Sequence, residues 1–473
     1  MAENRRATVL SWGLGVFAAA WVWTGVLAHL GAPVGPSEEY LDLGRRLYRT
    51  GSLATQSDPG VLRPPGYLAF IAATLHLRDA WTAVRGLPAG QATTDEEAVL
   101  QAQSVVNAAA AVAVFAFAVS LVPPFEAACA ALALACGPVA LPIVGVWSYP
   151  TLHVALVAFA TAHLAHAVGA APRRSLSPLL AGVSWGLVTL VRPVTLILPP
   201  FVYLLARRQR DRSGRSAGLF ALLFTAGMAL AILPYTVRNY RVTGRVVLVN
   251  AQGGVALWAA TARRFEPHEE FLSWGSLWGE RGMIIYRRVT NHPEYDLETF
   301  SAHVLELDDA FRAQALRNLR RRPGVYVANV ATNLLAFCRD PMDRWPIRLA
   351  NANQWDPRRF ELLASAYSVA LLLLALTGVV VGVHRRDDAA WTVLLVFGTM
   401  AMSHALTYLN GRYTYVKLPL LAMALPLCFA ALADLSVRWR RWPSGVRLSS
   451  VLAATVLALT AASTLILLLA SKS

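Results

Sequence analysis

The sequence has little charge for its length. Of 473 residues only 15% are charged, whereas 56% are hydrophobic, and the mean hydropathy is +0.46. This composition excludes a soluble globular protein, in which about 25% of residues are charged. Apolar runs of about 20 residues, long enough to cross a bilayer, recur along the chain. The composition therefore predicts an all-α polytopic membrane protein.

Cysteine is also scarce. Three of the four cysteines, Cys129, Cys136 and Cys428, lie inside apolar segments, and Cys338 stands alone in a polar region. No CxxC spacing occurs, so the sequence predicts neither a disulfide nor a zinc site.

Lysine is almost missing, since Lys417 and Lys472 are the only two, and the net charge of +15 comes from arginine. The arginines cluster in short groups beside apolar segments, as topology signals and lipid-headgroup contacts do. We therefore exclude a nucleic-acid partner and expect membrane lipids as partners instead.

Eleven segments are long and apolar enough to be predicted as spans. They are 7–30, 98–122, 126–146, 149–169, 176–191, 193–206, 218–236, 361–384, 389–409, 416–435 and 447–470. Trp21 and Trp23 stand where a signal peptide would need small residues, so we expect the first segment to be a retained span. The short spans at 176–191 and 193–206 meet at Arg192-Pro193 and could instead be a broken pair dipping into the outer surface.

Arginines in short loops predict the orientation. Those on one side are Arg5-Arg6, Arg173-Arg174, the run from Arg207 to Arg215, Arg385-Arg386 and the run from Arg438 to Arg441. We assign that side, with the N-terminus, to the cytoplasm and expect the protein in the cytoplasmic (inner) membrane. The chain then divides into a transmembrane part at 1–236 with an outer loop at 31–97, an outer region at 237–360, and C-terminal spans at 361–473.

Two helices are predicted in the first outer loop. Ser37 is a suitable N-cap and Gly51 a suitable residue after the last turn, so we expect one helix over 38–50, amphipathic and lying on the membrane. The run from Pro64 to Leu77 is too short to span and is typical of an interfacial helix. Together the two helices would frame a small cavity on the outer side.

The outer region at 237–360 is predicted to be mixed. Val246 to Val249 could form a short strand, and Gly253-Gly254 has strand and turn neighbours but lacks the frame of a phosphate-binding loop. Leu305 to Leu319 is an amphipathic helix pattern. From its position we expect this region to cover the cavity and to select the acceptor.

Several motifs, in order along the chain, resemble the GT-C glycosyltransferases in their family 39 form, which includes protein O-mannosyltransferases and lipid A aminoarabinose transferases. The motifs are Glu38-Glu39-Tyr40, Arg63-Pro64-Pro65-Gly66-Tyr67, Val191-Arg192-Pro193, Leu233 to Tyr240 with Gly244 and Gly253-Gly254, and Gly411-Arg412-Tyr413 before Leu418-Pro419. The resemblance covers nearly the whole chain.

The resemblance implies a hexosyl- or pentosyltransferase that moves a sugar from a polyprenyl-phosphate donor to an acceptor glycan, lipid or protein outside the cytoplasmic membrane. Inverting transfer needs a carboxylate to take the acceptor's proton, and cations to hold the departing phosphate. A divalent cation, Mg²⁺ or Mn²⁺, is a candidate for the second role, with no metal ligands identified. Two alternatives stay open: a flippase or transporter for a lipid-linked precursor, and a binder without catalysis.

The candidate bases lie in the first outer loop. Many similar proteins carry an acidic residue four positions before the helix tyrosine, where this chain has Pro36. The remaining local carboxylates are therefore the candidates, namely Glu38, Glu39, Asp42 and Asp58. Glu38 is favoured over Glu39, because it shares the polar helix face with Asp42. For each of them a structural role, at a helix N-terminus or in a turn, is the alternative.

Four arginines are candidates for contacting the donor phosphate, with headgroup anchoring as the alternative. They are Arg63, Arg192, Arg238 and Arg412. Five further residues are expected around the substrate cavity, namely Tyr40, Tyr67, Tyr149, His153 and Tyr413. His153 stands one turn after Tyr149, near where similar proteins carry a second acidic residue. His404 is predicted to be a satisfied residue of the helix bundle.

Overall fold

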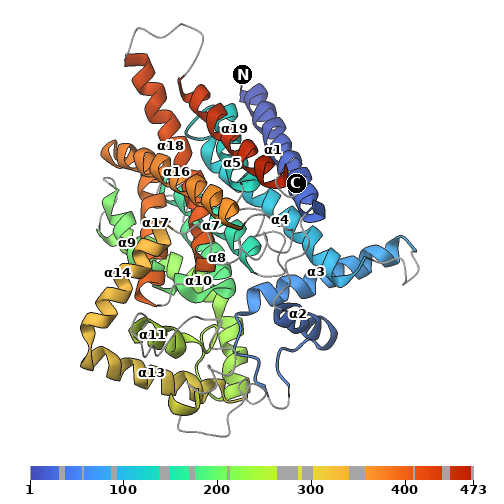
Figure 1. Cartoon of the computed structure of the whole chain (residues 1–473), viewed down its shortest axis with the longest axis vertical. Coiled ribbons are helices and arrows are strands. Elements are labelled where there is room, and N and C mark those ends of the chain that lie inside the picture. Colours follow the sequence, from blue (N-terminus) through green and yellow to red (C-terminus); the bar gives the residue numbers. More distant parts are fainter. Residues whose placement is uncertain are drawn as a thin grey trace.

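In the computed structural model, the helices of the chain pack into one bundle with further helices gathered at one end (Figure 1). The structure describes residues 2–30, 38–55, 58–86, 93–137, 149–169, 176–209, 214–263, 286–289, 302–339, 357–407, 411–438 and 448–469. The described residues contain no β-strand, so the predicted strand at Val246–Val249 is wrong. These residues are instead an irregular segment after the last turn of a long helix.

Each predicted span overlaps a helix, and parts of some spans, such as 138–146, lie outside the described residues. The helices are α1 (Ala2–Leu30), α4 (Asp95–Ala118), α5 (Pro124–Cys136), α7 (Pro150–Gly169), α8 (Leu176–Val191), α9 (Leu198–Arg208), α10 (Gly214–Thr243), α16 (Pro357–His384), α17 (Asp388–Leu406), α18 (Lys417–Arg438) and α19 (Leu448–Leu469). Within the described residues, seven helices are long and apolar enough to cross a membrane. The protein is thus an all-α, multi-pass membrane protein.

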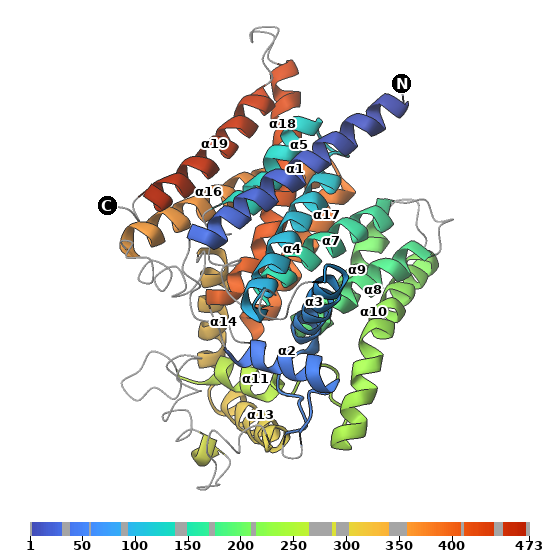
Figure 2. The ribbon, with the colours of Figure 1, turned by 90° about the vertical axis from the view of Figure 1, so that its right-hand side faces the viewer.

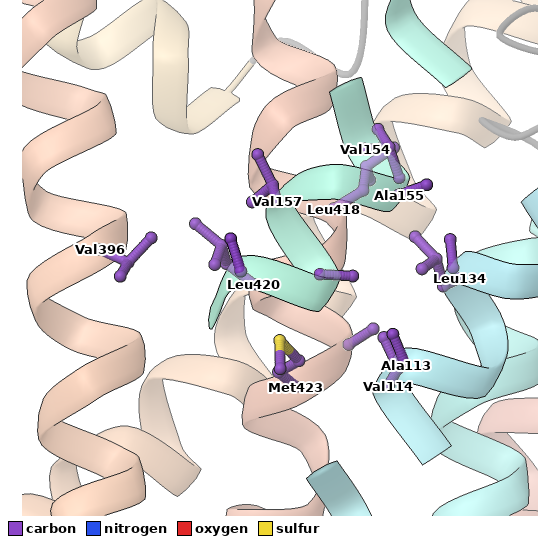
Figure 3. Packing of buried hydrophobic residues seen from close by; sticks show 14 of the residues in the cluster. Ala113, Val114, Leu134, Val154, Ala155, Val157, Val396, Leu418, Leu420 and Met423 are labelled. Carbon is purple, nitrogen blue, oxygen red and sulfur yellow. The ribbon is translucent and has the colours of Figure 1, made fainter. Parts of the chain in front are cut away.

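Close packing between spans depends on glycine. An added Cβ at Gly182 of α8 would lie 2.0 Å from the Phe224 carbonyl oxygen of α10, and one at Gly227 would lie 2.0 Å from the Leu179 oxygen. Such contacts let two backbones approach, as small residues do between membrane helices. In the bundle centre, side chains from α4, α5, α7, α17 and α18 converge, among them Val114, Leu134, Val157, Val396 and Leu420 (Figure 3).

Five further helices belong to the predicted outer loop and outer region: α2 (Glu38–Thr50), α3 (Pro65–Val84), α11 (Gly253–Thr261), α13 (Val304–Arg321) and α14 (Pro323–Arg339). In Figure 2, α2, α11 and α13 lie below the bundle, and the lower half of α10 extends down beside them. The helices predicted at 38–50 and 305–319 are confirmed, and Gly51 has the positive φ of 68° expected after a helix end.

Two local predictions are wrong. The helix predicted to end at Leu77 continues to Val84, because Arg78 and Asp79 pair with one another and with neighbouring helices instead of ending the apolar run. Gly253 and Gly254 do not adjoin a strand, since they begin helix α11.

A second, smaller hydrophobic core joins the two outer regions. Val61 and Leu62 of the first outer loop pack with Trp258, Tyr286 and Phe311 from the outer region. The backbone N–H of Ala251 also donates to the Val61 carbonyl oxygen at 2.9 Å, and Asn250 donates to the Leu62 oxygen at 3.3 Å. Because Arg63 follows Leu62 directly, the outer region fixes the position from which its side chain starts.

Candidate active site

Aromatic side chains from four separate segments, among them α2 and α3, meet at one place in the structure. The ring of Tyr40 on α2 lies 5.8 Å from that of Tyr67 on α3 and 5.6 Å from that of Tyr149, directly before α7. Tyr149 in turn lies 6.4 Å from Tyr415 in η4 (Gly411–Val416). The edge-on arrangement of the first two pairs is the one that aromatic quadrupoles favour. We call Tyr40, Tyr67, Tyr149 and Tyr415 the tyrosine cluster.

Two residues at the cluster, Tyr67 and His153, are fully buried. Tyr67 is fully buried, and its hydroxyl donates to Oε1 of Gln103 at 2.7 Å, so it supports Tyr40 from behind. His153 is also fully buried; its ring lies 6.0 Å from that of Tyr415, and its Nδ1 is 3.4 Å from the Tyr415 hydroxyl. Tyr67 and His153 therefore form the wall of the site. Tyr413 lies in η4, with its side chain outside the described residues.

Two arginines cover the two central rings. The guanidinium carbon of Arg63 lies 5.5 Å from the centre of the Tyr40 ring, and that of Arg192 lies 5.6 Å from the centre of the Tyr149 ring. Both distances are within the range of a cation–π contact. Arg192 caps the short 3₁₀ helix η2 (Pro193–Ile197) with an extended backbone, as expected of a residue before proline. The two cations thus lie on neighbouring rings of one cluster.

Glu39 is the described carboxylate that reaches this cluster. Arg63 donates to it twice, from Nε to Oε1 at 2.7 Å and from Nη2 to Oε2 at 2.8 Å. This is the two-pronged geometry in which an arginine fixes the plane of a carboxylate. The Glu39 side chain remains 40% exposed, so a ligand can still approach it.

Two of the other predicted bases, Asp42 and Asp58, lie away from the cluster. Asp42 points away from the cluster, with its side chain 67% exposed and Arg45 at 3.4 Å. Asp58 accepts the backbone N–H of Gly60 at 2.7 Å, the turn contact named as its structural alternative. Glu38 begins α2, with its side chain outside the described residues.

Arg238 makes contacts of a different kind from those of Arg63 and Arg192. Arg238 donates to the Gly60 carbonyl oxygen at 3.2 Å and to Oδ1 of Asn239 at 3.1 Å, and so holds the turn at Asp58 against α10. Arg412 lies in η4 three residues before the cluster's Tyr415, and its side chain is outside the described residues.

Two further buried residues, His404 and Lys417, contact the end of α14. His404 of α17 is fully buried; its Nδ1 donates to the Met400 oxygen at 2.7 Å, and its ring stacks on Phe337 at 5.5 Å. Lys417 is fully buried and donates to the carbonyl oxygens of Phe337 and Cys338, at the end of α14. A cation at a helix C-terminus is favoured by the helix dipole. The sequence analysis did not name Lys417 or Tyr415 as site residues, although both lie within four residues after Tyr413.

A network of charges holds the helix that carries Glu39 and Tyr40. Asp95, the first residue of α4, accepts from Nε of Arg45 on α2 at 2.6 Å and also pairs with Arg78 of α3. Tyr48 of α2 donates to Asp79 of α3, and this hydrogen bond, with help from Arg78, keeps the pKa of Asp79 below its ordinary value. Three helices are thus locked together on the side of α2 away from the tyrosine cluster.

Within the described residues, no three His, Cys, Asp or Glu side chains group as metal ligands.

Comparison with known proteins gives the fold. No protein-family model and no curated protein matches the sequence. Among solved structures, the archaeal oligosaccharyltransferase AglB from Archaeoglobus fulgidus, in complex with an inhibitory peptide and a dolichol-phosphate, matches 98% of this chain with a TM-score of 0.53 and 14% identity. The same enzyme with Zn and sulfate has a TM-score of 0.54 over 97% of the chain, again at 14% identity.

The chain spans about half of that enzyme's length, 55% and 52% in the two structures. ArnT from Cupriavidus metallidurans, bound to undecaprenyl phosphate, matches 96% of this chain and 85% of its own length at 15% identity, with a TM-score of 0.39. AglB and ArnT are GT-C glycosyltransferases. The matches with TM-scores above 0.5 show that the chain shares the fold of the aligned part of AglB.

Proposed function

We propose that the protein is a glycosyltransferase that moves a sugar from a polyprenyl-phosphate donor to an acceptor hydroxyl or phosphate on the outer face of the membrane. One observation carries the proposal: in a GT-C fold, a half-exposed carboxylate, Glu39, and a cation, Arg192, adjoin two touching rings, Tyr40 and Tyr149. This pairs a proton acceptor with a phosphate partner across one pair of aromatic rings.

Arg192 is the residue that we assign to the donor phosphate. A guanidinium can hold two phosphate oxygens at once, and near the membrane surface it stabilises the charge that grows as the sugar leaves. Tyr149 beneath it fixes the guanidinium plane. These contacts support a donor phosphate beside η2, the short helix that Arg192 caps.

Glu39 is the residue that we assign as base. The acceptor oxygen forms a bond to the anomeric carbon while the bond from that carbon to the phosphate oxygen breaks. The acceptor's proton passes to the Glu39 carboxylate, and the bonding electrons leave with the lipid phosphate. Attack opposite to the leaving group inverts the anomeric centre. Arg63 keeps the carboxylate plane fixed for this transfer.

A transfer assay with synthetic polyprenyl-phosphate sugars tests the assignment. We expect Glu39→Gln to lower kcat by about 10²–10⁴-fold, the usual contribution of a general base. Arg192→Gln should lower it by about 10²-fold or more, as loss of a charge-stabilising donor does. The matched control is Asp42→Asn, a carboxylate three residues along the same helix that faces away. Full activity of Glu39→Gln would remove Glu39 as the base and return the role to Glu38.

The same assay separates the alternatives. If the wild-type protein releases no lipid phosphate from any donor but binds polyprenyl phosphate, it is a non-catalytic binder. If it moves a fluorescent polyprenyl-linked sugar between leaflets of a vesicle without cleaving it, it is a flippase. Either result overturns the proposed transferase.

The proposed orientation has its own test, in a variant without native cysteines. Arg49→Cys at the end of α2 should react with a membrane-impermeant maleimide added outside intact cells. Arg215→Cys at the start of α10 should react only after the membrane is opened. Both side chains are exposed, so access depends on the side of the membrane. The reverse pattern would place the site on the cytoplasmic face.

A further inference from the structure

A cavity lies next to η2, on the side of the outer region. Its volume is about 240 Å³, and it is bounded by η2, the segment 245–251, the start of α11 and helix α13. At about 30 Å³ per water molecule, it holds roughly eight waters, which suits one sugar ring better than an extended glycan. The candidate active site uses none of the side chains that line it.

The lining has an apolar and a polar part. Pro193 and Leu196 of η2 contribute apolar surface, together with Val247, Val249 and Leu305. The polar part consists of Arg245, Asn250, Asp308, Asp309 and Arg312. A pyranose ring has the matching character, with C–H faces and a rim of hydroxyl groups.

The charges in the lining balance. Arg245 pairs with Asp309, and Arg312 donates to Asp308 at 2.7 Å and lies 3.8 Å from Asp309. Two arginines facing two aspartates leave no net charge to attract a phosphate. Arg245, Asp309 and Arg312 are about half exposed, so their remaining donors and acceptors are available to hydroxyl groups.

The N-terminus of α11 is the feature of the cavity that favours anions, and Asp308 already occupies it. The N-terminus of α11 would attract a negative group through its free N–H groups. Asp308 fills that position, since its Oδ1 accepts the N–H of Gly254 at 2.6 Å. A neutral ligand therefore fits this cavity better than an anionic one.

The cavity adjoins the proposed donor site through the backbone. Arg192, over Tyr149, and Pro193, in the cavity lining, are consecutive, so their Cα atoms lie about 3.8 Å apart. The other walls come from the outer region, whose position beside the site suits a role in acceptor selection. We propose that this cavity binds one neutral sugar unit of the acceptor and places it beside the donor. The assignment to the acceptor rests on the proposed function.

Gly253 allows the cavity to be filled without disturbing the fold. It lines the cavity, and an added Cβ there meets no atom within 4 Å, so Gly253→Leu should project into open space. Gly324, the second residue of α14, is a matched control, because its added Cβ also meets nothing and it lies outside the cavity. Asp309→Asn removes the charge of one lining group at nearly constant size.

Saturation-transfer NMR on the full-length protein in detergent, with methyl glycosides of mannose, glucose, galactose and N-acetylglucosamine, tests binding without any need for activity. We expect at least one neutral glycoside to bind the wild type and Gly324→Leu equally. Gly253→Leu should abolish the signal. Asp309→Asn should weaken binding about tenfold, the loss of one charge-assisted hydrogen bond. No binding by any glycoside, binding that survives Gly253→Leu, or stronger binding of methyl glucuronide would overturn the proposal.

Transfer kinetics separate this inference from the proposed function. With a glycoside acceptor, Gly253→Leu should raise the acceptor KM at least tenfold and leave the donor KM unchanged. A raised donor KM instead would overturn the assignment to the acceptor. If the wild type lacks transferase activity but binds a glycoside at this cavity, the proposed function fails and the sugar site stands.

Discussion

Arg63 holds Glu39 by two parallel hydrogen bonds of 2.7 and 2.8 Å, while its guanidinium also covers the ring of Tyr40. Arg63 thus positions two groups: the Glu39 carboxylate, which is the one described carboxylate beside the cluster, and the Tyr40 ring, which contacts Tyr149. The two partners of Arg63 are consecutive in α2, whereas Arg63 itself comes from the segment that precedes α3.

At position 63 the planar shape of the guanidinium group matters as well as its positive charge. Lysine keeps the charge but cannot hold both oxygens of one carboxylate. We expect Arg63→Lys to lower kcat about tenfold, which corresponds to about 1.4 kcal/mol, without changing the donor KM. Arg49→Lys, on the exposed end of α2, is the control and should behave like wild type. A change in donor KM alone would place Arg63 on the donor instead.

Gly254 and Gly253 should differ in their tolerance of a methyl group. An added Cβ at Gly254 would lie 1.9 Å from the backbone oxygen of Asp308, which a rotamer change cannot move. We expect Gly254→Ala to destabilise the protein by about 1–3 kcal/mol, as overpacking does. Gly253→Ala, one residue earlier, should have little effect. Thermal unfolding in detergent measures both, and equal midpoints would contradict the close approach of α11 and α13.

We expect Asp95 to contribute more to the stability of the first outer loop than an exposed carboxylate such as Asp42. It accepts from Arg45 and pairs with Arg78, so Asp95→Asn leaves two half-buried guanidinium groups with weaker partners. We expect a cost of about 1–3 kcal/mol, seen as faster hydrogen exchange in α2 and α3. Asp42→Asn, whose ion pair is exposed, should cost about 0–1 kcal/mol. Unchanged exchange in Asp95→Asn would mean that packing alone holds these helices.

Asp308 should give the outer region a specific pH dependence. Burial raises its pKa, and the N–H of Gly254 and the Arg312 guanidinium oppose only part of that rise. A carboxyl whose pKa is higher in the folded state contributes stability below its unfolded pKa, and this contribution is lost as the pH rises through the folded pKa. We expect the unfolding midpoint of wild type to fall relative to Asp308→Asn as the pH rises from about 4, the ordinary pKa of aspartate. A parallel pH dependence of the two proteins would contradict the raised pKa.

The sequence by itself determined the class and the helices. Apolar runs near 20 residues have few alternatives to a membrane helix, because unpaired backbone groups are too costly in lipid. The helix over 38–50 could be predicted to the residue, since its polar face and Gly51 are local signals. The motifs also indicated Tyr40, Arg63 and Arg192 as site residues, because each stands in a short pattern that resembles those of GT-C enzymes.

Only the tertiary structure decided which of these residues meet. Glu39 and Asp42 were both candidate bases by sequence, and they differ because one side of α2 faces Arg63 and the tyrosine cluster, while the other faces solvent. Helix α3 runs past Leu77 because Asp95, seventeen residues after Arg78, neutralises it. Lys417 and Tyr415 joined the site through contacts with α14 and α7, far away in sequence. Local pattern sets periodicity and charge along a helix, but the partner that a side chain finds is set by how distant helices pack.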